Sequence, residues 1–470
     1  MLVVVVGGGI CGLGTAMLLA RDGHDVTLLE RDPDPVPETA LDAWARWERK
    51  GVAQFRQPHN FMPGLRRVLE AELPDIQERL PNARASRFDF VHPLPPFFQD
   101  RTPRPIDEDL WTYTARRPVG EWVFAQAAAS ERRLTIRRGV HVTELIGGPS
   151  AISNVPHVAG VRISTGERLS ADLVVDATGR QSKAAQWLGA IGGRPPYEEQ
   201  ADSGFTYYTR YFAGTTPQRT AGPLTPLGTI SLLTLPGDND VWSVTIFMAS
   251  GDQPLKNLRH DEKWMSVLRA CPLHAHWVDG DPMTGVFAMS GIVDRYRRFL
   301  VDGLPVVTGF VAVADAWGCT NPSAGRGLTV GMLQAVVLRD VLREASSDPA
   351  ALVHEFDRRT EDTIAPWYHS QIAADRARFD QMEALRQGRE PRPPAEGLAQ
   401  DIQQLQSAML TDPDLFRIGL EYAATLTPIQ QIVRRPGAVD RIRAAARAVS
   451  AAPVRPFPGP DRRQLLELVS

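Results

Sequence analysis

The sequence predicts an α/β fold in which a parallel βαβ unit opens the chain, an antiparallel β-sheet is inserted later, and helices form the C-terminal region. Three stretches carry this prediction. Residues 2–30 pass from an apolar, β-branched run through a glycine-rich turn and a helix pattern to a second apolar run. Residues 203–214 and 229–250 show the pattern of antiparallel strands, and residues 348–449 are charged with helical periodicity.

Composition limits the number of domains and the class of partner. A chain of 470 residues with 43% hydrophobic residues is long enough for two or three domains with substantial cores. The formal net charge of −3 provides no basic field for nucleic acid. The three cysteines form no C-x-x-C pair, which favours a reducing cytoplasm. His274 and His276 are too small a set for zinc, so we predict no bound metal.

The first twenty residues are apolar enough to resemble a membrane segment. However, glycines interrupt the run, no basic segment precedes it, and the polar stretch RDGHD follows at once. A strand, a turn and the start of a helix explain this pattern better. We therefore expect a soluble protein without a membrane span.

The N-terminal unit has the features of a dinucleotide-binding turn. Residues 2–6 predict a strand buried on both faces, and GGGICG at residues 7–12 matches G-x-G-x-x-G. The predicted helix that follows ends at Gly23, a residue suited to a left-handed cap. Residues 26–29 predict a second strand, and Glu30 ends it. Strand, helix, second strand and terminal acid therefore occur in the order and spacing of a dinucleotide-binding unit, although this segment does not distinguish NAD from FAD.

Each position in this unit has a mechanical reason. Gly7 permits the tight turn, Gly9 lets the backbone approach a pyrophosphate, and Gly12 lets the helix pack closely on the strand. The amides at the start of the helix favour phosphate. Glu30 is placed to hold both hydroxyls of an adenosine ribose and would repel a 2′-phosphate, which disfavours NADP at this turn. We assign the following residues to the cofactor site: Gly7, Gly9, Cys11, Gly12, Glu30 and Arg31.

Two later stretches indicate which dinucleotide is bound. Residues 162–189 predict a hairpin and then a buried strand that runs into DATGR at residues 176–180. The apolar run at residues 304–313 predicts a strand that leads into ADAWGCTNPSAGRG and then a helix. In order and spacing, the glycine turn and these two motifs resemble FAD-dependent monooxygenases of the aromatic-hydroxylase type, a superfamily with a para-hydroxybenzoate-hydroxylase-like fold that includes bacterial epoxidases. The likeness extends from residue 1 to about residue 345.

The resemblance implies an α/β architecture: a Rossmann-like FAD-binding domain with an inserted antiparallel β-sheet substrate domain and a helical C-terminal region. We assign the three parts as follows: residues 1–75, 110–200 and 290–345 to the FAD-binding domain, residues 76–109 and 201–289 to the substrate-binding domain, and residues 346–470 to the helical C-terminal region.

The resemblance also implies contacts with FAD. Asp315 bonds the ribityl chain, and Pro322 borders the ring where oxygen reacts. The amides of Gly325, Gly327 and Leu328 face the pyrimidine edge of the flavin. A helix N-terminus in this place stabilises the negative charge of a reduced flavin.

One departure and several further contacts complete the predicted cofactor site. The family usually has Gly before the ribityl-binding Asp, whereas this chain has Ala314, which brings a methyl group near the diphosphate. The family places an Arg at Arg117, against the flavin phosphate or ribityl chain, and Arg116 competes for this role. The strand backbone at Val142 holds the adenine. The DATGR turn adds two residues, Asp176 and Gly179.

Two regions are candidates for the substrate side. KGVAQFRQPHNFM at residues 50–62 resembles a segment that lies beside the flavin in epoxidase-like relatives, so Gln57 and His59 are candidate active-site residues. The alternative is that they only bond local backbone. The predicted antiparallel sheet is where the family carries its substrate, and five aromatic residues either line an apolar pocket there or form plain sheet core: Tyr207, Tyr208, Tyr211, Trp242 and Phe247.

The resemblance implies a single-component FAD-dependent monooxygenase. NADPH or NADH reduces the flavin, O₂ forms a C4a-hydroperoxide, and one oxygen atom enters a small apolar organic substrate by hydroxylation or epoxidation. Epoxidation needs no acid–base residue, whereas phenol hydroxylation needs a base, for which His59 is our candidate. A separate flavin reductase stays open as the electron source. The helical C-terminal region either covers the substrate mouth or forms a homodimer contact.

Other functions were weighed against this one. An FAD-dependent reductase or dehydrogenase of prenyl-like double bonds is the main alternative. A flavin halogenase is disfavoured because the chain lacks W-x-W-x-I-P, Trp44 and Trp47 being in the wrong context, and contains few lysines. An NAD-binding sensor or structural Rossmann protein is opposed by the second and third motifs.

Overall fold

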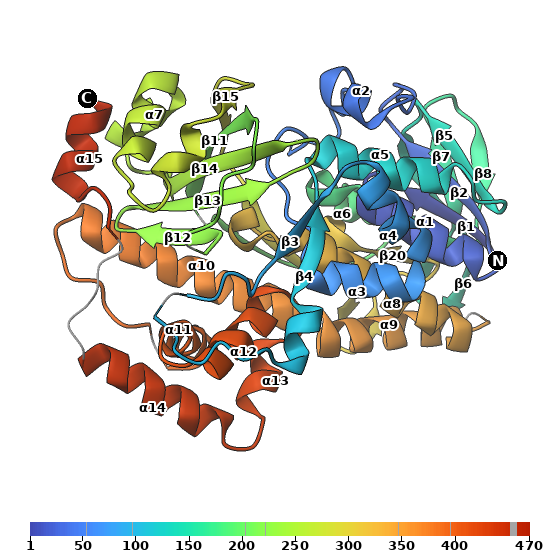
Figure 1. Ribbon diagram of the computed structural model, residues 1–470. Coiled ribbons are helices and arrows are strands. Elements are labelled where there is room, and N and C mark those ends of the chain that lie inside the picture. Colours follow the sequence, from blue (N-terminus) through green and yellow to red (C-terminus); the bar gives the residue numbers. More distant parts are fainter. Residues whose placement is uncertain are drawn as a thin grey trace.

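A five-stranded parallel β-sheet lies at the centre of the part of the molecule that contains the N-terminus (Figure 1). The computed structural model describes residues 1–52, 54–95, 97–202, 204–220, 222–345, 347–394, 396–451 and 458–470. The sheet has the order β20-β9-β1-β2-β5, and all its pairings are parallel. Its strands are β20 (Phe310–Ala312), β9 (Leu173–Asp176), β1 (Leu2–Val6), β2 (Asp25–Glu30) and β5 (Leu134–Arg138).

Both faces of this sheet are buried, which explains why its strands are apolar throughout. Val3 and Val5 face a layer of helices, and Val4 and Val6 face the opposite side. The helix layer contains α1 (Ile10–Arg21), α5 (Arg117–Ala128) and α8 (Gly327–Ala345), flanked by α2 (Ala40–Ala45), α3 (Pro63–Glu72) and α4 (Pro74–Asn82). The opposite side is covered by α6 (Ala184–Ala190) and the antiparallel sheet β6 (Val142–Ile152), β7 (Val155–Ile163) and β8 (Arg168–Ser170).

A second large sheet is antiparallel and has the order β12-β13-β14-β11-β15, with β16 also paired to β11. Tyr207 of β11 is opposite Phe247 of β14 in the register. The other face, with Tyr208 and Phe212, packs against α7 (Asp261–Arg269) and the terminal helix α15 (Arg462–Val469). The strands are β11 (Phe205–Ala213), β12 (Leu224–Leu227), β13 (Ile230–Pro236), β14 (Val241–Ala249), β15 (Asp281–Pro282) and β16 (Phe287–Met289).

Smaller sheets lie outside the sheets described above. One joins β10 (Tyr197–Asp202), β17 (Val293–Arg298) and β21 (Gly318–Cys319). The others pair β3 (Ser86–Asp89) with β4 (Trp111–Thr114), and β18 (Leu300–Val301) with β19 (Leu304–Pro305).

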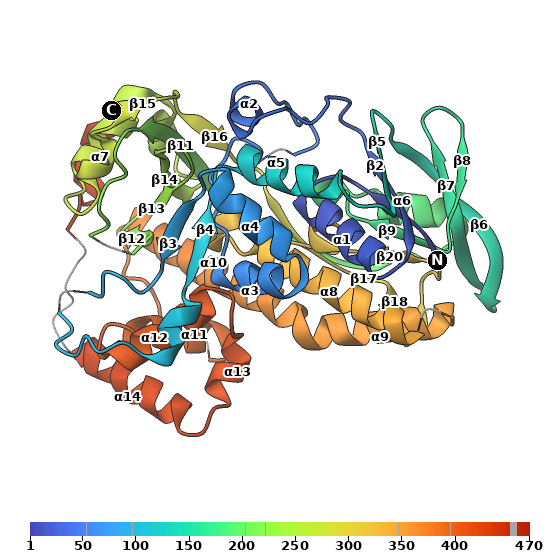
Figure 2. The ribbon, with the colours of Figure 1, turned by 45° about the vertical axis from the view of Figure 1, so that its right-hand side comes forward.

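Helices form most of the chain after residue 348. The helix α10 runs alongside the antiparallel sheet, and Figure 2 shows α11 to α14 gathered at the end of the molecule opposite β6 to β8. Arg378 of α10 donates hydrogen bonds to Ser231 Oγ at 3.1 Å and to the Gly228 carbonyl at 3.0 Å, which fixes the helix to β13. The helices are α9 (Pro349–Thr363), α10 (Ala365–Arg386), α11 (Leu398–Ala408), α12 (Pro413–Ala423), α13 (Ile429–Val433) and α14 (Ala438–Ala451).

The predicted fold class is confirmed, while one predicted strand is shorter than expected. The apolar run at residues 304–313 forms a two-residue hairpin strand and then β20. Gly309 separates them with a φ of +70°, and a Cβ there would lie 2.2 Å from the Val158 carbonyl oxygen. The assignment of residue ranges to domains stays a prediction. Among the described helices, none combines the length and apolarity needed to span a membrane.

Candidate functional site

One cavity extends from the glycine turn after β1 to the antiparallel sheet and the C-terminal helices. Its volume is about 2750 Å³. Pockets for single drug-sized ligands have volumes of roughly 300–1,000 Å³. The cavity is therefore large enough for a dinucleotide and a second organic molecule.

The glycine turn forms one wall of this cavity. Gly7 has a φ of +108°, and a Cβ on Gly12 would lie 2.0 Å from the Gly7 carbonyl oxygen, so both positions require glycine. Gly9 precedes α1, and a Cβ there would have only Glu121 Oε1 within 4 Å, at 3.9 Å. The turn is thus open on its cavity side. Because α1 has no side-chain cap, its first amides are available for an anion.

A buried network of charges supports the turn from behind. Glu30 Oε2 accepts hydrogen bonds from the Gly8 amide at 2.8 Å and from Arg49 at 2.6 Å. Arg49 also donates to Glu121 at 3.0 Å, and Glu121 accepts from Arg117 at 2.6 Å. All four side chains are nearly inaccessible to solvent. The network orients Glu30 at the ribose end and Arg117 at the other end of the predicted cofactor site.

Sequence reasoning missed Arg49 and Glu121. Arg49 lies in an irregular segment after Trp47, and Glu121 lies four residues after Arg117 on α5. The (i, i+4) spacing of Arg117 and Glu121 is a detectable signal for a helical pair. Nothing in the local sequence indicates the contact of Arg49 with either acid.

Asp315 lies between the glycine turn and α8. Within the described chain, no hydrogen bond or ion pair reaches its carboxylate, which lines the cavity. Burial raises its pKa, while Arg117 and Arg180 oppose this rise. An unpartnered carboxylate at the cavity wall is a suitable acceptor for hydroxyl groups such as those of a ribityl chain.

The alanine that replaces the family glycine adopts the backbone of a glycine. Ala314 has a φ of +53°, and its amide donates to Gln334 Oε1 at 2.8 Å. The absence of a side chain at Gly331 makes room for its methyl group, since a Cβ on Gly331 would lie 2.8 Å from the Ala314 Cβ. The absence of a side chain on α8 at Gly331 thus accommodates the Ala314 methyl group, while Ala314 also lines the cavity.

The loop before α8 completes the cofactor side. Pro322 begins a short 3₁₀ turn, Gly325 has a left-handed φ of +69°, and α8 begins at Gly327. Gly325, Gly327 and Leu328 line the cavity, although the Gly325 amide already donates a hydrogen bond to the Pro322 carbonyl at 3.0 Å. The open glycine turn, the unpartnered Asp315 carboxylate and this helix N-terminus fit the diphosphate, ribityl chain and ring of FAD.

Most of the residues predicted for the cofactor site line the cavity, and Asp176 is the exception. The Asp176 carboxylate is fully buried and accepts hydrogen bonds from Thr178 Oγ1 and Ser182 Oγ, each at 2.6 Å. The Asp176 carboxylate therefore stabilises the turn and does not line the cavity. The residues that do line the cavity are Gly7, Gly9, Cys11, Gly12, Glu30, Arg31, Arg117, Val142, Gly179, Asp315, Gly325, Gly327 and Leu328.

Gln57 and His59 also line the cavity, but His59 is poorly suited to the role of base. His59 Nδ1 is 3.1 Å from the Gln57 carbonyl oxygen. Burial, reinforced by Arg117, lowers the pKa of His59 to about 3, so its ring holds a proton too weakly to act as a base near pH 7. Gln57 Oε1 accepts from Thr209 Oγ1 at 3.0 Å, which ties this segment to β11.

Two of the five aromatic residues considered for a substrate pocket line the cavity, and the other three do not. Tyr207 and Phe247 line the cavity and stack with ring centroids 5.1 Å apart. Tyr208 and Trp242 lie in the core on the opposite face of the sheet, and Trp242 donates to the Trp277 carbonyl at 2.8 Å. Tyr211 is buried against Trp44, with ring centroids 4.9 Å apart, outside the cavity wall. Both faces of this sheet are apolar, so the alternation alone did not show which face meets the cavity.

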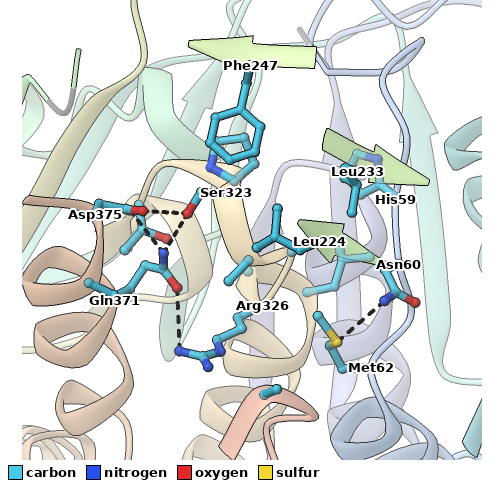
Figure 3. A pocket seen from close by; sticks show the side chains of 18 of the residues that line it. His59, Asn60, Met62, Leu224, Leu233, Phe247, Ser323, Arg326, Gln371 and Asp375 are labelled. Carbon is cyan, nitrogen blue, oxygen red and sulfur yellow. Dashed lines mark hydrogen bonds between the residues drawn. The ribbon is translucent and has the colours of Figure 1, made fainter. Parts of the chain in front are cut away.

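A polar cluster on α10 was not predicted. Asp375 accepts a hydrogen bond from Ser323 Oγ at 2.5 Å and another from Gln371 Nε2 at 2.9 Å (Figure 3). All three side chains are at the cavity wall. The helical C-terminal region therefore contributes directly to the cavity wall. This is what the first of the two roles considered for it, covering the substrate mouth, requires.

The fold is of the α/β class and its cavity is large enough for a dinucleotide, and known proteins were compared with the chain on this basis. Residues 3–40 match the family model of FAD-dependent oxidoreductases. Protein Rv3254 of Mycobacterium tuberculosis is 25% identical over 391 residues, which cover 77% of each chain.

Three solved structures share the fold. A flavoprotein/dehydrogenase from Cytophaga hutchinsonii has a TM-score of 0.62 and 13% identity, covering 95% of this chain and 98% of that one. PqsL, a probable FAD-dependent monooxygenase from Pseudomonas aeruginosa, has a TM-score of 0.57 and 15% identity, covering 81% and 98%. The flavin-dependent brominase Bmp2 has a TM-score of 0.58 and 12% identity, covering 82% and 89%. The chain therefore matches the family model of FAD-dependent oxidoreductases over its N-terminal residues and has the fold of PqsL and Bmp2.

Proposed function

We propose that this protein is an FAD-dependent monooxygenase that transfers one oxygen atom from O₂ to an apolar organic substrate, by hydroxylation or epoxidation. The observation that carries the proposal is the continuity of the cavity: the glycine turn and the α8 N-terminus share it with an apolar chamber under the antiparallel sheet. A reduced flavin, oxygen and a substrate must meet in one water-poor space for such a transfer. NADPH or NADH is the proposed reductant.

The residues of the chain have separate tasks in this proposal. The redox chemistry that activates O₂ is supplied by FAD when it is bound. Glu30 holds the adenosine ribose, the α1 amides hold the diphosphate, and Asp315 accepts hydrogen bonds from the ribityl hydroxyls. The N-terminus of α8 stabilises negative charge at the pyrimidine edge.

The chamber excludes water and orients the substrate. Phe247 and Tyr207 form its aromatic wall beside Pro322, and leucine and methionine side chains from the sheet and neighbouring loops complete the apolar lining. Figure 3 shows Phe247, Leu224 and Leu233 extending from strands of the antiparallel sheet into this space. Such a lining supplies burial for an apolar skeleton and few competing proton donors.

An FAD-dependent reductase or dehydrogenase of prenyl-like double bonds is the second candidate, favoured by the fold shared with the flavoprotein/dehydrogenase. A halogenase would need a lysine in the substrate chamber. Among the described residues, the lysines at the cavity wall are Lys50 and Lys183, next to Arg49 and the DATGR turn, respectively, on the cofactor side.

Isotope labelling tests the proposed function. The purified holoenzyme is supplied with NADPH or NADH, isotopically labelled dioxygen, and naphthol or styrene as probe substrates. Monooxygenation predicts one labelled oxygen atom in the organic product. Consumption of the reductant with all the label in hydrogen peroxide or water would contradict oxygen transfer, and reduction of the styrene double bond would support the second candidate.

A further inference from the structure

The most unusual group in the substrate chamber is the carboxyl group of Asp375. It is 4% exposed, and it accepts one hydrogen bond at each oxygen, from Ser323 Oγ and Gln371 Nε2. A carboxylate has about four acceptor positions. The two contacts from the protein therefore leave acceptor capacity, and the side chain lies at the wall of the cavity.

No cation in the described chain pairs with Asp375. Arg326, whose charge acts on Asp375, instead donates hydrogen bonds to the Tyr422 carbonyl at 3.1 Å and to Gln371 Oε1 at 3.5 Å, and it lies over the Tyr422 ring at 4.0 Å. Burying an acid without a counter-charge costs stability, so an arrangement of this kind at a cavity is a candidate functional site.

The position of Asp375 connects it to the predicted flavin site. Ser323 belongs to the 3₁₀ turn that begins with Pro322 and leads into α8. Figure 3 shows Asp375, Ser323 and Gln371 together at one side of the pocket, with Phe247 above and Leu224 and Leu233 across from them. A ligand bonded to Asp375 would therefore lie beside the turn that contains Ser323 and extend toward the apolar part of the chamber.

We infer that Asp375 is the hydrogen-bond acceptor that anchors the substrate, and that the substrate is an apolar skeleton carrying one hydrogen-bond donor, such as a phenolic hydroxyl group. This inference rests on the proposed function and specifies its substrate class. With a phenol, the O–H proton passes to the carboxylate, which becomes a neutral carboxylic acid, and the negative charge passes to the phenolate. The step needs no oxidant, and it raises the electron density of the ring that accepts oxygen.

The surroundings of Asp375 suit this proton transfer. Burial, with the charge of Asp294 on β17, raises its pKa to about 7, while Ser323, Gln371 and Arg326 oppose the rise. The charge of Asp375 in turn helps to raise the pKa of Tyr207 on β11. An acid that changes protonation near neutral pH is well matched to a general base. Asp375 thus replaces His59 as the candidate base for hydroxylation.

The test compares two probes that differ only in the donor. The oxidised holoenzyme is titrated with naphthol and with methoxynaphthalene substituted at the same ring position, and binding is followed by the change in flavin absorbance. The wild-type protein is expected to bind naphthol roughly ten- to a hundredfold more tightly than the ether. This is the affinity ratio that corresponds to one hydrogen bond with a charged acceptor. In Asp375→Asn this ratio falls to about threefold or less, with the affinity for the ether unchanged.

The controls separate anchoring from a structural role. Asp401→Asn removes the same charge from α11 outside the cavity wall and is expected to keep the wild-type ratio. Asp375→Glu is expected to recover part of it. Equal binding of both probes by the wild type, binding of neither probe, or an unchanged ratio in Asp375→Asn would overturn the inference. These titrations need no reductant or oxygen. A failure of the substrate-anchoring inference can therefore be distinguished from a failure of oxygen transfer in the labelling experiment.

Discussion

The backbone amide of Gly8 donates a hydrogen bond of 2.8 Å to Glu30 Oε2. This contact joins the turn after β1 to the end of β2, the next strand in the sheet. It places the predicted ribose-binding carboxylate and the predicted diphosphate-binding turn in one rigid unit. Arg49 donates to the same oxygen at 2.6 Å, so the carboxylate is oriented from both sides.

Glu30→Ala is expected to weaken FAD binding by about 1–3 kcal/mol, the range for a lost hydrogen bond to a charged group. The dissociation constant is measured by titrating the apoprotein with FAD and following flavin fluorescence. Glu38→Ala removes an exposed glutamate near this strand and serves as control. Unchanged affinity in Glu30→Ala would remove Glu30 from the cofactor site.

Arg49→Met is expected to lower the free energy of unfolding by about 3–5 kcal/mol, because it leaves buried Glu30 and Glu121 without their shared cation. Urea unfolding of the apoprotein measures this change. Arg46→Met is the matched control, since the Arg46 side chain is 76% exposed. Equal unfolding of Arg49→Met and the wild type would show that the network contributes nothing to stability.

Gly331→Ala is expected to destabilise the fold by about 1–3 kcal/mol, the usual cost of overpacking. The new methyl group would lie 2.7 Å from Cys11 Sγ and 2.8 Å from Ala314 Cβ. Adding Ala314→Gly removes one of these contacts and is expected to recover part of the loss. A double-mutant cycle in urea measures the coupling, and strict additivity would refute the proposed accommodation of Ala314.

His59→Gln is expected to make the protein less sensitive to acid. The pKa of His59 is lowered from 6.5 to about 3, so His59 binds a proton more weakly in the folded wild-type protein than in the unfolded chain. Wild-type stability is therefore fully present above pH 6.5 and is lost as the pH falls toward about 3. Unfolding free energies across this window check the prediction. The exposed His354→Gln is the control, and parallel pH curves for wild type and His59→Gln would contradict it.

Asp375→Asn is expected to gain stability relative to the wild type as the pH rises. The pKa of Asp375 is raised from 3.8 to about 7, so the folded protein holds this proton more tightly than the unfolded chain. That stabilising contribution is present at low pH and is lost between these two values. Melting temperatures of wild type, Asp375→Asn and Asp401→Asn across this range measure the effect. A constant difference between wild type and Asp375→Asn would show that the carboxyl group titrates normally.

Local patterns were sufficient for the parts of the molecule that depend on contiguous residues. The run of β1, the glycines of the turn and the start of α8 each follow from short stretches of sequence, and the structure has all three. The length of β20 was overestimated because the clash that requires Gly309 involves Val158, which is distant in sequence.

The unpredicted parts of the site depend on contacts between distant segments. Arg49 and Glu121 are separated by 72 positions, and Ser323 and Asp375 by 52. Neither pair has a local motif, so only the fold reveals it. The alternation along β14 assigned Trp242 and Phe247 to opposite faces of the sheet. Because both faces are apolar, it did not indicate that Phe247 faces the cavity.

Rapid mixing of the reduced holoenzyme with oxygen tests the central claim most directly. If the cavity holds FAD beside a water-poor chamber for oxygen transfer, a transient absorbance band belonging to neither the reduced nor the oxidised enzyme should form and then decay. Direct return to the oxidised spectrum without such a band would contradict the monooxygenase proposal.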